Sequence, residues 1–264
     1  MITNTINPIA LSFGAVSIRW YGLLFSCGFI MGYIIMQFLF KRKGYKGEDL
    51  DKLLFYIFLG TVIGARLAHC LIYEPDYYLS HPIDILKVWQ GGLASHGGTV
   101  GVFLAIFLFL RNKKYRFFEL TDMLCIPVAL VCTLIRIGNY CNSEILGKFT
   151  HSDYGVVFAR LGENMPRHPV QLYESLTYFM IFILLVCIYF YYKKRPEGFI
   201  LGLLLTLVFT SRMLLEPFKE EQAQYTTGFW NVGSLLSIPF VILGLAVIYY
   251  SFHKQNKTGT HHES

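Results

Sequence analysis

The chain has 264 residues, of which 54% are hydrophobic and only 15% are charged. Charged residues make up about 25% of a typical soluble domain, so this composition excludes an ordinary soluble protein. The net charge of +6 does not indicate nucleic-acid binding, because the basic residues cluster beside apolar runs, as they do in membrane proteins.

Seven apolar runs follow one another along the chain, and most reach the roughly 20 residues that cross a bilayer. They cover about 18–40, 50–73, 92–110, 118–138, 170–192, 198–215 and 230–250. Since lipid offers no partner for unpaired backbone groups, these runs are expected to be continuous helices. We predict an all-α integral membrane protein with seven transmembrane helices in a single membrane domain, residues 1–253. Residues 139–169 are expected to form an outer loop or cap, and 254–264 a disordered cytoplasmic tail.

The basic residues predict how these spans are oriented. The segments after the first, third and fifth spans and the C-terminal tail carry fourteen Lys and Arg residues, against five in the opposite segments. Cytoplasmic loops are enriched in Lys and Arg, so we expect the N-terminus outside and the C-terminus in the cytoplasm. Residues Met1 to Ser17 lack a cationic start before a short apolar core, and no cleaved signal peptide is expected.

Ionisable and polar residues within the spans gather in the outer third of the membrane under this orientation. Arginine at such a depth is costly unless it faces a polar cavity or an anion. Two or three arginines around one cavity suit a phosphate, which a guanidinium binds through two parallel hydrogen bonds, and a phospholipid headgroup is the phosphate available there. The residues concerned are Arg19, Tyr21, Arg66, His69, His96, Arg136, Glu174 and Arg212.

The centre of this expected site is Arg136-Ile-Gly-Asn-Tyr-Cys-Asn-Ser-Glu144, completed by Gly147. Asn139 and Glu144 can orient the arginine by hydrogen bonding, and Gly147 allows a close backbone approach. A structural alternative is that arginines at span ends extend to the membrane interface. The structural alternative for Arg66, which lies well inside its span, is an ion pair with Glu174 or another buried carboxylate, and Tyr21 would be an interfacial belt residue.

His96 lies in Gly91-Gly-Leu-Ala-Ser-His-Gly-Gly98, where Gly97 and Gly98 leave room for a substrate beside the imidazole. A histidine can accept a proton near neutral pH, which makes this residue a candidate base. The alternative is a histidine hydrogen-bonded inside the bundle, with glycines that serve helix packing.

Several other chemistries lack their motifs. The sequence has no His-Glu-x-x-His, no Gly-x-Ser-x-Gly and no Gly-x-x-x-x-Gly-Lys. Its six cysteines lie mostly within the apolar runs and show no metal-ligand spacing. We therefore expect no metal and no cofactor.

The signature from Arg136 to Glu144 with Gly147 resembles that of the prolipoprotein diacylglyceryl transferases. Other stretches resemble motifs of the same family, in the expected order and over nearly the whole chain. They are Arg19-Trp-Tyr-Gly22, Gly64-Ala-Arg66, Trp89-Gln-Gly-Gly with Ser-His-Gly-Gly98, and His168-Pro-Val-Gln-Leu-Tyr-Glu174.

The resemblance implies a seven-helix enzyme of the bacterial inner membrane that moves the diacylglyceryl group of phosphatidylglycerol onto the lipobox cysteine of a preprolipoprotein. The products would be a thioether-linked lipid and glycerol phosphate, so the nucleophile would belong to the substrate. His96, Arg136, Arg212 and Tyr21 match positions that would be catalytic. Arg136, Asn139, Glu144, Gly147, Arg66, Gly97 and Gly98 would contact the substrate.

One departure from the family concerns the segment after the sixth span, where Lys219-Glu-Glu-Gln222 stands in place of a frequent Arg-x-Pro-Asp, and no role is assigned to residues 216–228. Two other classes of protein compete with an enzyme. A transporter should show internal repeats and a polar site near the bilayer midplane, and neither is evident. A lipid receptor could share the anion site but would not need His96.

Overall fold

The computed structural model describes residues 2–14, 16–88, 91–92, 94–111, 113–220 and 232–259. The chain folds into two compact units. The first unit contains residues 1–35 and 121–264, and the second contains residues 36–120. The single domain of residues 1–253 expected from the sequence stays a prediction.

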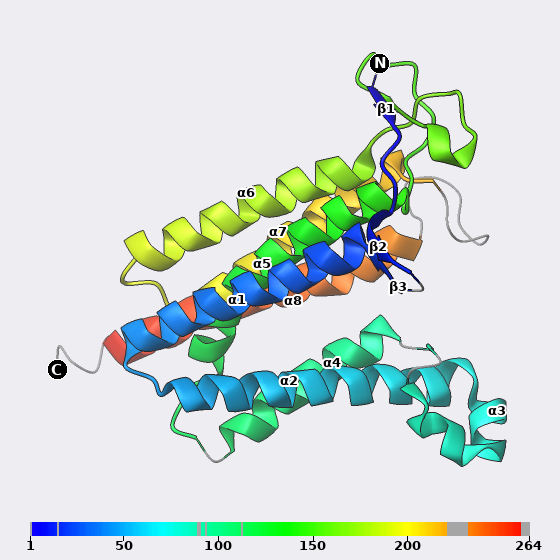
Figure 1. Ribbon diagram of the computed structural model, residues 1–264. Helices are drawn as coiled ribbons and strands as arrows, with labels where there is room; N and C mark the ends of the chain where they lie inside the picture. The colour runs from blue at the N-terminus through cyan, green and yellow to red at the C-terminus, as the bar shows by residue number, and fades with distance from the viewer. Residues whose placement is uncertain are drawn as a thin grey trace. The chain divides into compact units, whose positions relative to one another are not determined.

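The first unit is built on long helices, which are drawn in Figure 1. They are α1 (Trp20–Lys43), which begins in this unit, α5 (Phe117–Asn142), α6 (Val170–Tyr191), α7 (Phe199–Leu215) and α8 (Val232–Gly259). Gly28 of α1 lets that helix approach Val131 of α5 closely. The hydroxyl of Ser175 on α6 donates to the carbonyl of Thr133 on α5, at 3.2 Å.

A buried carboxylate ties α5 to the start of α7. Both oxygens of Asp122 accept backbone N–H groups at the beginning of α7, one from Gly198 and one from Leu201, each at 2.9 Å. The first N–H groups of a helix have no partner within the helix, and an anion at that end also interacts favourably with the helix dipole. Asp122 therefore fixes where α7, the helix that carries Arg212, begins.

Short strands and turns cover one end of the first unit. Strand β1 (Ile2–Asn4) pairs in parallel with β4 (Val156–Phe158), and β2 (Ile9–Phe13) pairs antiparallel with β3 (Val16–Arg19). The 3-10 turn η4 (Ala159–Leu161) follows β4. The side chain of Asn4 donates to the carbonyl of Tyr140, at 3.1 Å, which fastens the N-terminal strand to the end of α5. Residues 139–169, expected as an outer loop or cap, thus pair with the N-terminal strand.

The second unit is a pair of closely packed helices with a short helical extension. Helix α2 (Gly47–Ala68) continues as the π-helical turn η1 (His69–Tyr73), followed by α3 (Pro75–Ser80), the 3-10 turn η2 (Pro82–Leu86) and α4 (Ser95–Leu110). Gly60 and Gly64 of α2 face Gly97 and Gly101 of α4, and a Cβ at any of these four glycines would collide with the opposite helix. Glycines four apart allow backbones to approach this closely.

The connections at the other end of α2 are held by charge and aromatic contacts. Lys43 pairs with Glu119 at 2.7 Å, and Lys113 pairs with Asp49 at 2.5 Å. The rings of Tyr45 and Tyr115 lie 4.4 Å apart. Burial and a hydrogen bond to Asp49 raise the pKa of the Tyr115 phenol to about 12, so this phenol stays a hydrogen-bond donor at neutral pH.

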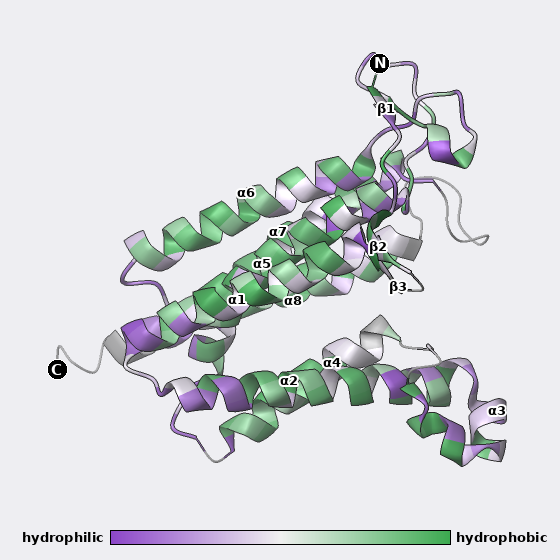
Figure 2. Ribbon diagram, in the orientation of Figure 1, coloured by the Kyte–Doolittle hydropathy of each residue, from purple (hydrophilic) through white to green (hydrophobic). Residues whose placement is uncertain are grey.

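The helices agree with the predicted spans to within a few residues at most boundaries. Within the described residues, six helices are long and apolar enough to cross a membrane, and α4, with 16 residues, is a shorter apolar helix. In Figure 2 the hydrophobic residues occupy the middle of the long helices, and hydrophilic residues gather at their ends. These features are those of a multi-pass membrane protein; the seventh span and the orientation stay predictions.

The structure differs from the expectation at three places. It contains the two small sheets described above, which the sequence did not predict. Helix α5 continues to Asn142, past the expected end near 138. Helix α8 extends to Gly259, into the tail expected to be disordered, where Gln255 donates to the carbonyl of Lys194 at 2.8 Å and secures the helix end.

Candidate functional site

The extra turn of α5 brings Arg136 and Asn139 onto one face of that helix. Nη1 of Arg136 donates to the side-chain oxygen of Asn139, at 3.3 Å. The amide nitrogen of Asn139 in turn donates to Glu144, at 3.1 Å. Asn139 is buried, and its side-chain oxygen and nitrogen bond to different residues. These two bonds fix the orientation of the amide. The prediction that these three residues act together is consistent with this chain of hydrogen bonds.

Helix α5 ends in a turn that folds Glu144 back toward the helix. Ser143 and Ile145, on either side of this glutamate, both have a φ of 55°. The left-handed region is unusual for a serine and strained for a β-branched isoleucine. The reversal lets Asn142 donate to the Glu144 carboxylate at 3.1 Å. Backbone strain of this kind persists where the surrounding contacts fix the chain, and it is often found at functional sites.

Glu174 is the buried acid at the centre of the cluster, and none of its side chain is exposed. One of its oxygens lies 3.1 Å from Nε of Arg136, and the other lies 2.9 Å from the ammonium of Lys219. Both are ion pairs by distance, although neither oxygen meets hydrogen-bond geometry. Removing one partner of a buried ion pair is strongly destabilising, so Arg136, Glu174 and Lys219 depend on one another.

Lys219 reaches Glu174 because two loops pair with each other. The backbone N–H of Lys148 donates to Phe218 at 2.8 Å, and that of Glu220 donates to Leu146 at 3.0 Å. Gly147 stands opposite Lys219 in this pairing. A Cβ on Gly147 would collide with the carbonyl of His168, so glycine lets this segment lie close to the chain that leads into α6.

Glu216 extends the network to the start of α8. Its carboxylate lies 3.1 Å from the ammonium of Lys219. The same carboxylate occupies the place where a Cβ on Gly233, in the first turn of α8, would stand. A carboxylate is favourable at the N-terminus of a helix, so Glu216 is stabilised by both Lys219 and α8.

Arg212, on α7, completes the group of cations. Its positive charge and that of Arg136 both act on Cys132 of α5 and Tyr178 of α6. Among the residues that the structure describes, no side-chain hydrogen bond or ion pair involves the Arg212 guanidinium. This guanidinium is therefore available to an anion.

Tyr21 is held against the same stretch of α5. A Cβ on Gly138 would lie 2.9 Å from the Tyr21 ring and 3.2 Å from its Cα, so a glycine at position 138 allows the start of α1 to pack directly on α5. The phenol thus belongs to the same unit as Arg136, Asn139, Glu144, Gly147 and Arg212.

The other predicted residues belong to the second unit. All three nitrogens of the Arg66 guanidinium donate to backbone carbonyls. Gly97 packs against Gly64 of α2, the kind of contact that glycines serve in helix packing. A Cβ on Gly98 would meet its neighbours only at ordinary van der Waals distances. His96 lies in the first turn of α4, and its side chain is outside the described part of the chain, as are Trp89 and Gln90.

Sequence reasoning missed two members of the cluster, Lys219 and Glu216. Both fall in the loop 216–228 to which no role was assigned, because Lys219-Glu-Glu-Gln222 departs from the expected motif. A signal was present nevertheless, since Glu216 and Lys219 stand three residues apart at the end of a span and can pair. Residues 221–228 of that loop lie outside the described residues.

The cluster carries an excess of positive charge. Three positive charges, those of Arg136, Lys219 and Arg212, stand against the two buried or half-buried carboxylates with which Arg136 and Lys219 pair, those of Glu174 and Glu216. Glu144 is exposed, and water screens its charge. One positive charge is thus left for a ligand. Helices long and apolar enough to span a bilayer define a multi-pass membrane protein, and the cationic cluster is its candidate site.

Comparison with known proteins identifies the family. The family model described as prolipoprotein diacylglyceryl transferase matches residues 8–250. A phosphatidylglycerol–prolipoprotein diacylglyceryl transferase from Tolumonas auensis is 53% identical over 247 residues, which cover 93% of this chain and 95% of the relative. Relatives of the same name are 44% identical in Chloroherpeton thalassium, over 93% of this chain and 92% of the relative, and 38% identical in Bacteroides fragilis, over 95% of each. The chain belongs to the prolipoprotein diacylglyceryl transferase family.

Proposed function

We propose that this protein transfers the diacylglyceryl group of phosphatidylglycerol to the lipobox cysteine of a preprolipoprotein, the first step of bacterial lipoprotein maturation. Membership of the family and the names of relatives of nearly equal length support this activity. The structural observation that carries the proposal is the cluster of Arg136, Lys219 and Arg212, with one positive charge in excess. A phosphodiester carries one negative charge and is the group that such a cluster would bind.

The bonding capacity of the cluster also supports a phosphate ligand. Arg136 uses Nε toward Glu174 and Nη1 toward Asn139, and among the described residues nothing is bonded to its Nη2. Among the described residues, nothing is bonded to the guanidinium of Arg212 either. Donors that are already oriented and await an acceptor stabilise charge without the cost of reorganisation.

The proposed reaction forms one bond and breaks another. The thiolate of the lipobox cysteine attacks the glyceryl carbon of the diacylglyceryl group and forms a carbon–sulfur bond. The carbon–oxygen bond to phosphate breaks, its electron pair stays on the phosphate oxygen, and glycerol phosphate leaves. Negative charge grows on that oxygen as the bond breaks, so Arg136 and Arg212 would bind the transition state more tightly than the bound lipid.

The remaining residues are assigned roles by position. His96 would accept the proton of the incoming thiol, because the thiolate is the reactive form. Asn139 and Glu144 would orient Arg136, and Gly147 would let the backbone approach the headgroup, with which Tyr21 would be in contact. Substrate contact by Arg66, Gly97 and Gly98 stays a prediction from the sequence. The proposal includes no metal or cofactor.

The membrane arrangement is part of the proposal. The seven predicted spans, with the N-terminus outside and the C-terminus in the cytoplasm, would place the cluster at the outer side of the bacterial inner membrane. The apolar helices and the excess of basic residues on the predicted inner side support this arrangement. Phosphatidylglycerol and a membrane-anchored signal peptide can both reach such a site within the lipid.

The activity is tested with purified protein in vesicles that contain phosphatidylglycerol and a lipobox peptide. We expect the peptide to gain the mass of one diacylglyceryl group, and a peptide with serine in place of the cysteine to gain none. Arg136→Lys should lower kcat/KM by about 100-fold or more, because an ammonium cannot serve Glu174, Asn139 and a phosphate together. The exposed Arg160→Lys is the matched control and should keep full activity.

The same assay separates an enzyme from the lipid receptor. Binding of phosphatidylglycerol by folded protein, with no mass gain on the peptide, would contradict the proposed transfer and favour the receptor. Wild-type rates for Arg136→Lys would remove Arg136 from the mechanism. Release of intact lipid on the far side of the vesicle, without modification of the peptide, would favour a transporter.

A further inference from the structure

Arg66 is a buried arginine whose donors are already committed to backbone carbonyls. Its side chain lies near the end of α2, and the residue is only 3% exposed. Nε donates to the carbonyl of Ile85 at 3.0 Å, Nη2 to that of Asp84 at 2.6 Å and Nη1 to that of Gly91 at 2.6 Å. In this state Arg66 can bind a phosphate only by giving up bonds to its own chain.

The acceptors belong to a single stretch of chain, which we call the 84–94 segment. It runs from within η2 to the residue before α4, and the structure describes its residues 84–88, 91, 92 and 94. Arg66 bonds to carbonyls at the beginning of this segment and again shortly before its end, since Nη1 also lies 3.3 Å from the carbonyl of Gly92. One guanidinium therefore fixes two points of the backbone on the way to α4.

Two further contacts hold the 84–94 segment against the end of α2 and the beginning of η1. The backbone N–H of Ala94 donates to the carbonyl of Ala65, at 2.9 Å. Gly92 has a φ of +68°, and a Cβ there would collide with the His69 ring. The guanidinium carbon of Arg66 also lies 5.0 Å from the centre of the Tyr78 ring, within the range of a cation–π interaction.

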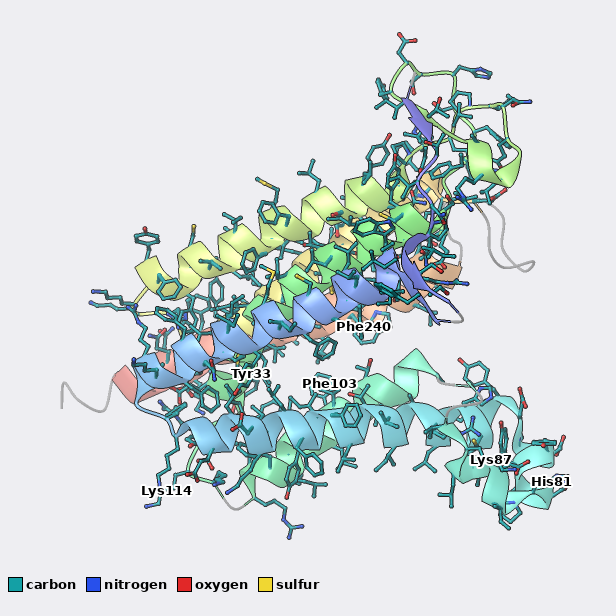
Figure 3. The ribbon with its side chains drawn as sticks, viewed as in Figure 1. Tyr33, His81, Lys87, Phe103, Lys114 and Phe240 are labelled. Atoms are coloured by element: carbon teal, nitrogen blue, oxygen red, sulfur yellow. The ribbon has the colours of Figure 1, made fainter. Side chains whose placement is uncertain are left out.

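The start of the segment is secured from its other side by Asp84. Its carboxylate lies 2.6 Å from the ammonium of Lys87 and accepts a hydrogen bond of 2.8 Å from Tyr77. Figure 3 shows Lys87 and His81 close to α3 and Lys114 at the opposite end of α2. The hydrogen bonds from Lys87 and Tyr77 keep the pKa of the Asp84 carboxyl below its usual value, so these contacts persist at neutral pH.

The charge of Arg66 makes this arrangement unusual. Among the described residues, no carboxylate oxygen lies within ion-pair distance of its guanidinium. Carbonyl dipoles and one aromatic face balance the buried charge instead. A buried charge without a counter-ion is costly, and the fork geometry of guanidinium, unlike an ammonium, can bond several carbonyls at fixed angles. The geometry therefore favours a role that depends on those angles.

We propose that Arg66 is a positioning residue that holds the 84–94 segment and thereby sets the path of the backbone into the first turn of α4, which carries His96. This inference rests on the proposed function for the role of His96. In this proposal Arg66 binds carbonyls of the protein's own backbone. The sequence had instead suggested that it contacts the substrate.

Kinetics distinguish the two roles of Arg66. With Arg66→Lys we expect kcat to fall by about 10-fold to 100-fold, because a small displacement of a catalytic group is enough for such a loss. The KM for phosphatidylglycerol should not change. A raised KM with an unchanged kcat would show that Arg66 contacts the lipid and would overturn the proposal. Arg111→Lys, an exposed residue at the end of α4, is the matched control in the same unit.

Hydrogen exchange tests the inference independently of activity. In Arg66→Lys the amides of residues 84–94 should exchange about 10-fold faster than in the wild type, since charge-assisted bonds to the segment are lost. The amides of α4 from Gly101 onward should be unchanged, which shows that the helix pair is intact. Unchanged exchange in the 84–94 segment would overturn the proposal, even if the protein proved to have no transferase activity.

A second variant, Gly92→Ala, tests the proposal in case Arg66→Lys does not fold. Gly92→Ala keeps the charge of Arg66 but places a methyl group where His69 and Arg66 pack, and it strains a φ of +68°. We expect the same loss of kcat and the same faster exchange. If Gly92→Ala displaces the segment, as exchange would report, while kcat stays at the wild-type value, the positioning role is wrong.

Discussion

At the scale of single side chains, Glu174 is the central acid of the site. Among the described residues, it is the carboxylate that pairs with two cations of the cluster, Arg136 and Lys219. It is fully buried, and both cations within ion-pair distance of it belong to the cluster that we propose binds a phosphate. A carboxylate and a phosphate are both oxygen anions, so Glu174 occupies donors of the same kind as the substrate would. In the proposed mechanism, the headgroup uses the donors of Arg136 and Arg212 to which nothing is bonded among the described residues.

Removing the charge of Glu174 should therefore destabilise the protein in a way that the lipid partly repairs. Glu174→Gln leaves Arg136 and Lys219 without their shared counter-ion, which typically costs about 3–5 kcal/mol. Thermal unfolding in nanodiscs should show a lower Tm, and phosphatidylglycerol should raise the Tm of the variant more than that of the wild type. Zwitterionic phosphatidylethanolamine provides the lipid control, and Glu48→Gln, on an exposed residue of α2, the protein control. An equal effect of both lipids on the variant would contradict the role of Glu174.

His96 is the second residue whose role can be tested by itself. An imidazole that must accept a proton is inactive when protonated, so wild-type turnover should fall as the pH drops below about 6.5. His96→Gln should lower turnover and flatten its pH dependence between about 6 and 8. Turnover of the lipobox peptide is measured across this range. A variant with the wild-type pH profile would assign the base to another group.

At the scale of the helix pair, four glycines set the distance between α2 and α4. Because Gly60 and Gly64 meet Gly97 and Gly101 backbone to backbone, the start of α4 can lie directly on the end of α2. This contact also brings Ala94 within hydrogen-bonding distance of Ala65, at 2.9 Å. The packing of the two helices and the position of the 84–94 segment are thus parts of one arrangement.

Adding a methyl group to this contact should loosen the second unit. Gly64→Ala would bring its Cβ into collision with the carbonyl of Gly97, and overpacking of this kind costs about 1–3 kcal/mol. Gly47→Ala is the matched control, because a Cβ there meets nothing within 4 Å. Thermal unfolding in detergent compares the two variants. Equal stability of both would mean that the close approach of α2 and α4 is not maintained in the membrane protein.

At the scale of the whole molecule, the chain passes from the first unit to the second after Ile35 and returns after Leu120. The predicted site residues are divided between the units, with Arg136 and Arg212 in the first and Arg66 and His96 in the second. The sequence predicts that they converge on one lipid headgroup. That convergence stays a prediction, and the kinetic tests of Arg136, His96 and Arg66 examine it from both units.

The orientation of the whole chain can be measured by labelling single cysteines in a background without the six native ones. Ser80→Cys, on the predicted outer side, should react with a membrane-impermeant maleimide on intact spheroplasts. Lys114→Cys, on the predicted inner side, should react only after the membrane is opened, because positively charged loops remain in the cytoplasm. Both residues are exposed, so burial does not prevent labelling. Equal reactivity on intact spheroplasts would contradict the predicted orientation.

The sequence by itself determined the approximate limits of the long apolar helices, because the length and hydrophobicity of a span are local properties of the chain. It also singled out Arg136, Asn139 and Glu144. These residues lie in the last turns of α5 and just after its end, so their spacing along the chain predicts that they are close in space. Only the tertiary structure decided that Lys219 pairs with Glu174 and that Arg66 bonds to the 84–94 segment. Both contacts depend on how distant segments meet, the first through backbone pairing of Leu146 and Lys148 with residues 218–220. The direction in which a long cationic side chain turns is set by that geometry, and no local pattern of residues encodes it.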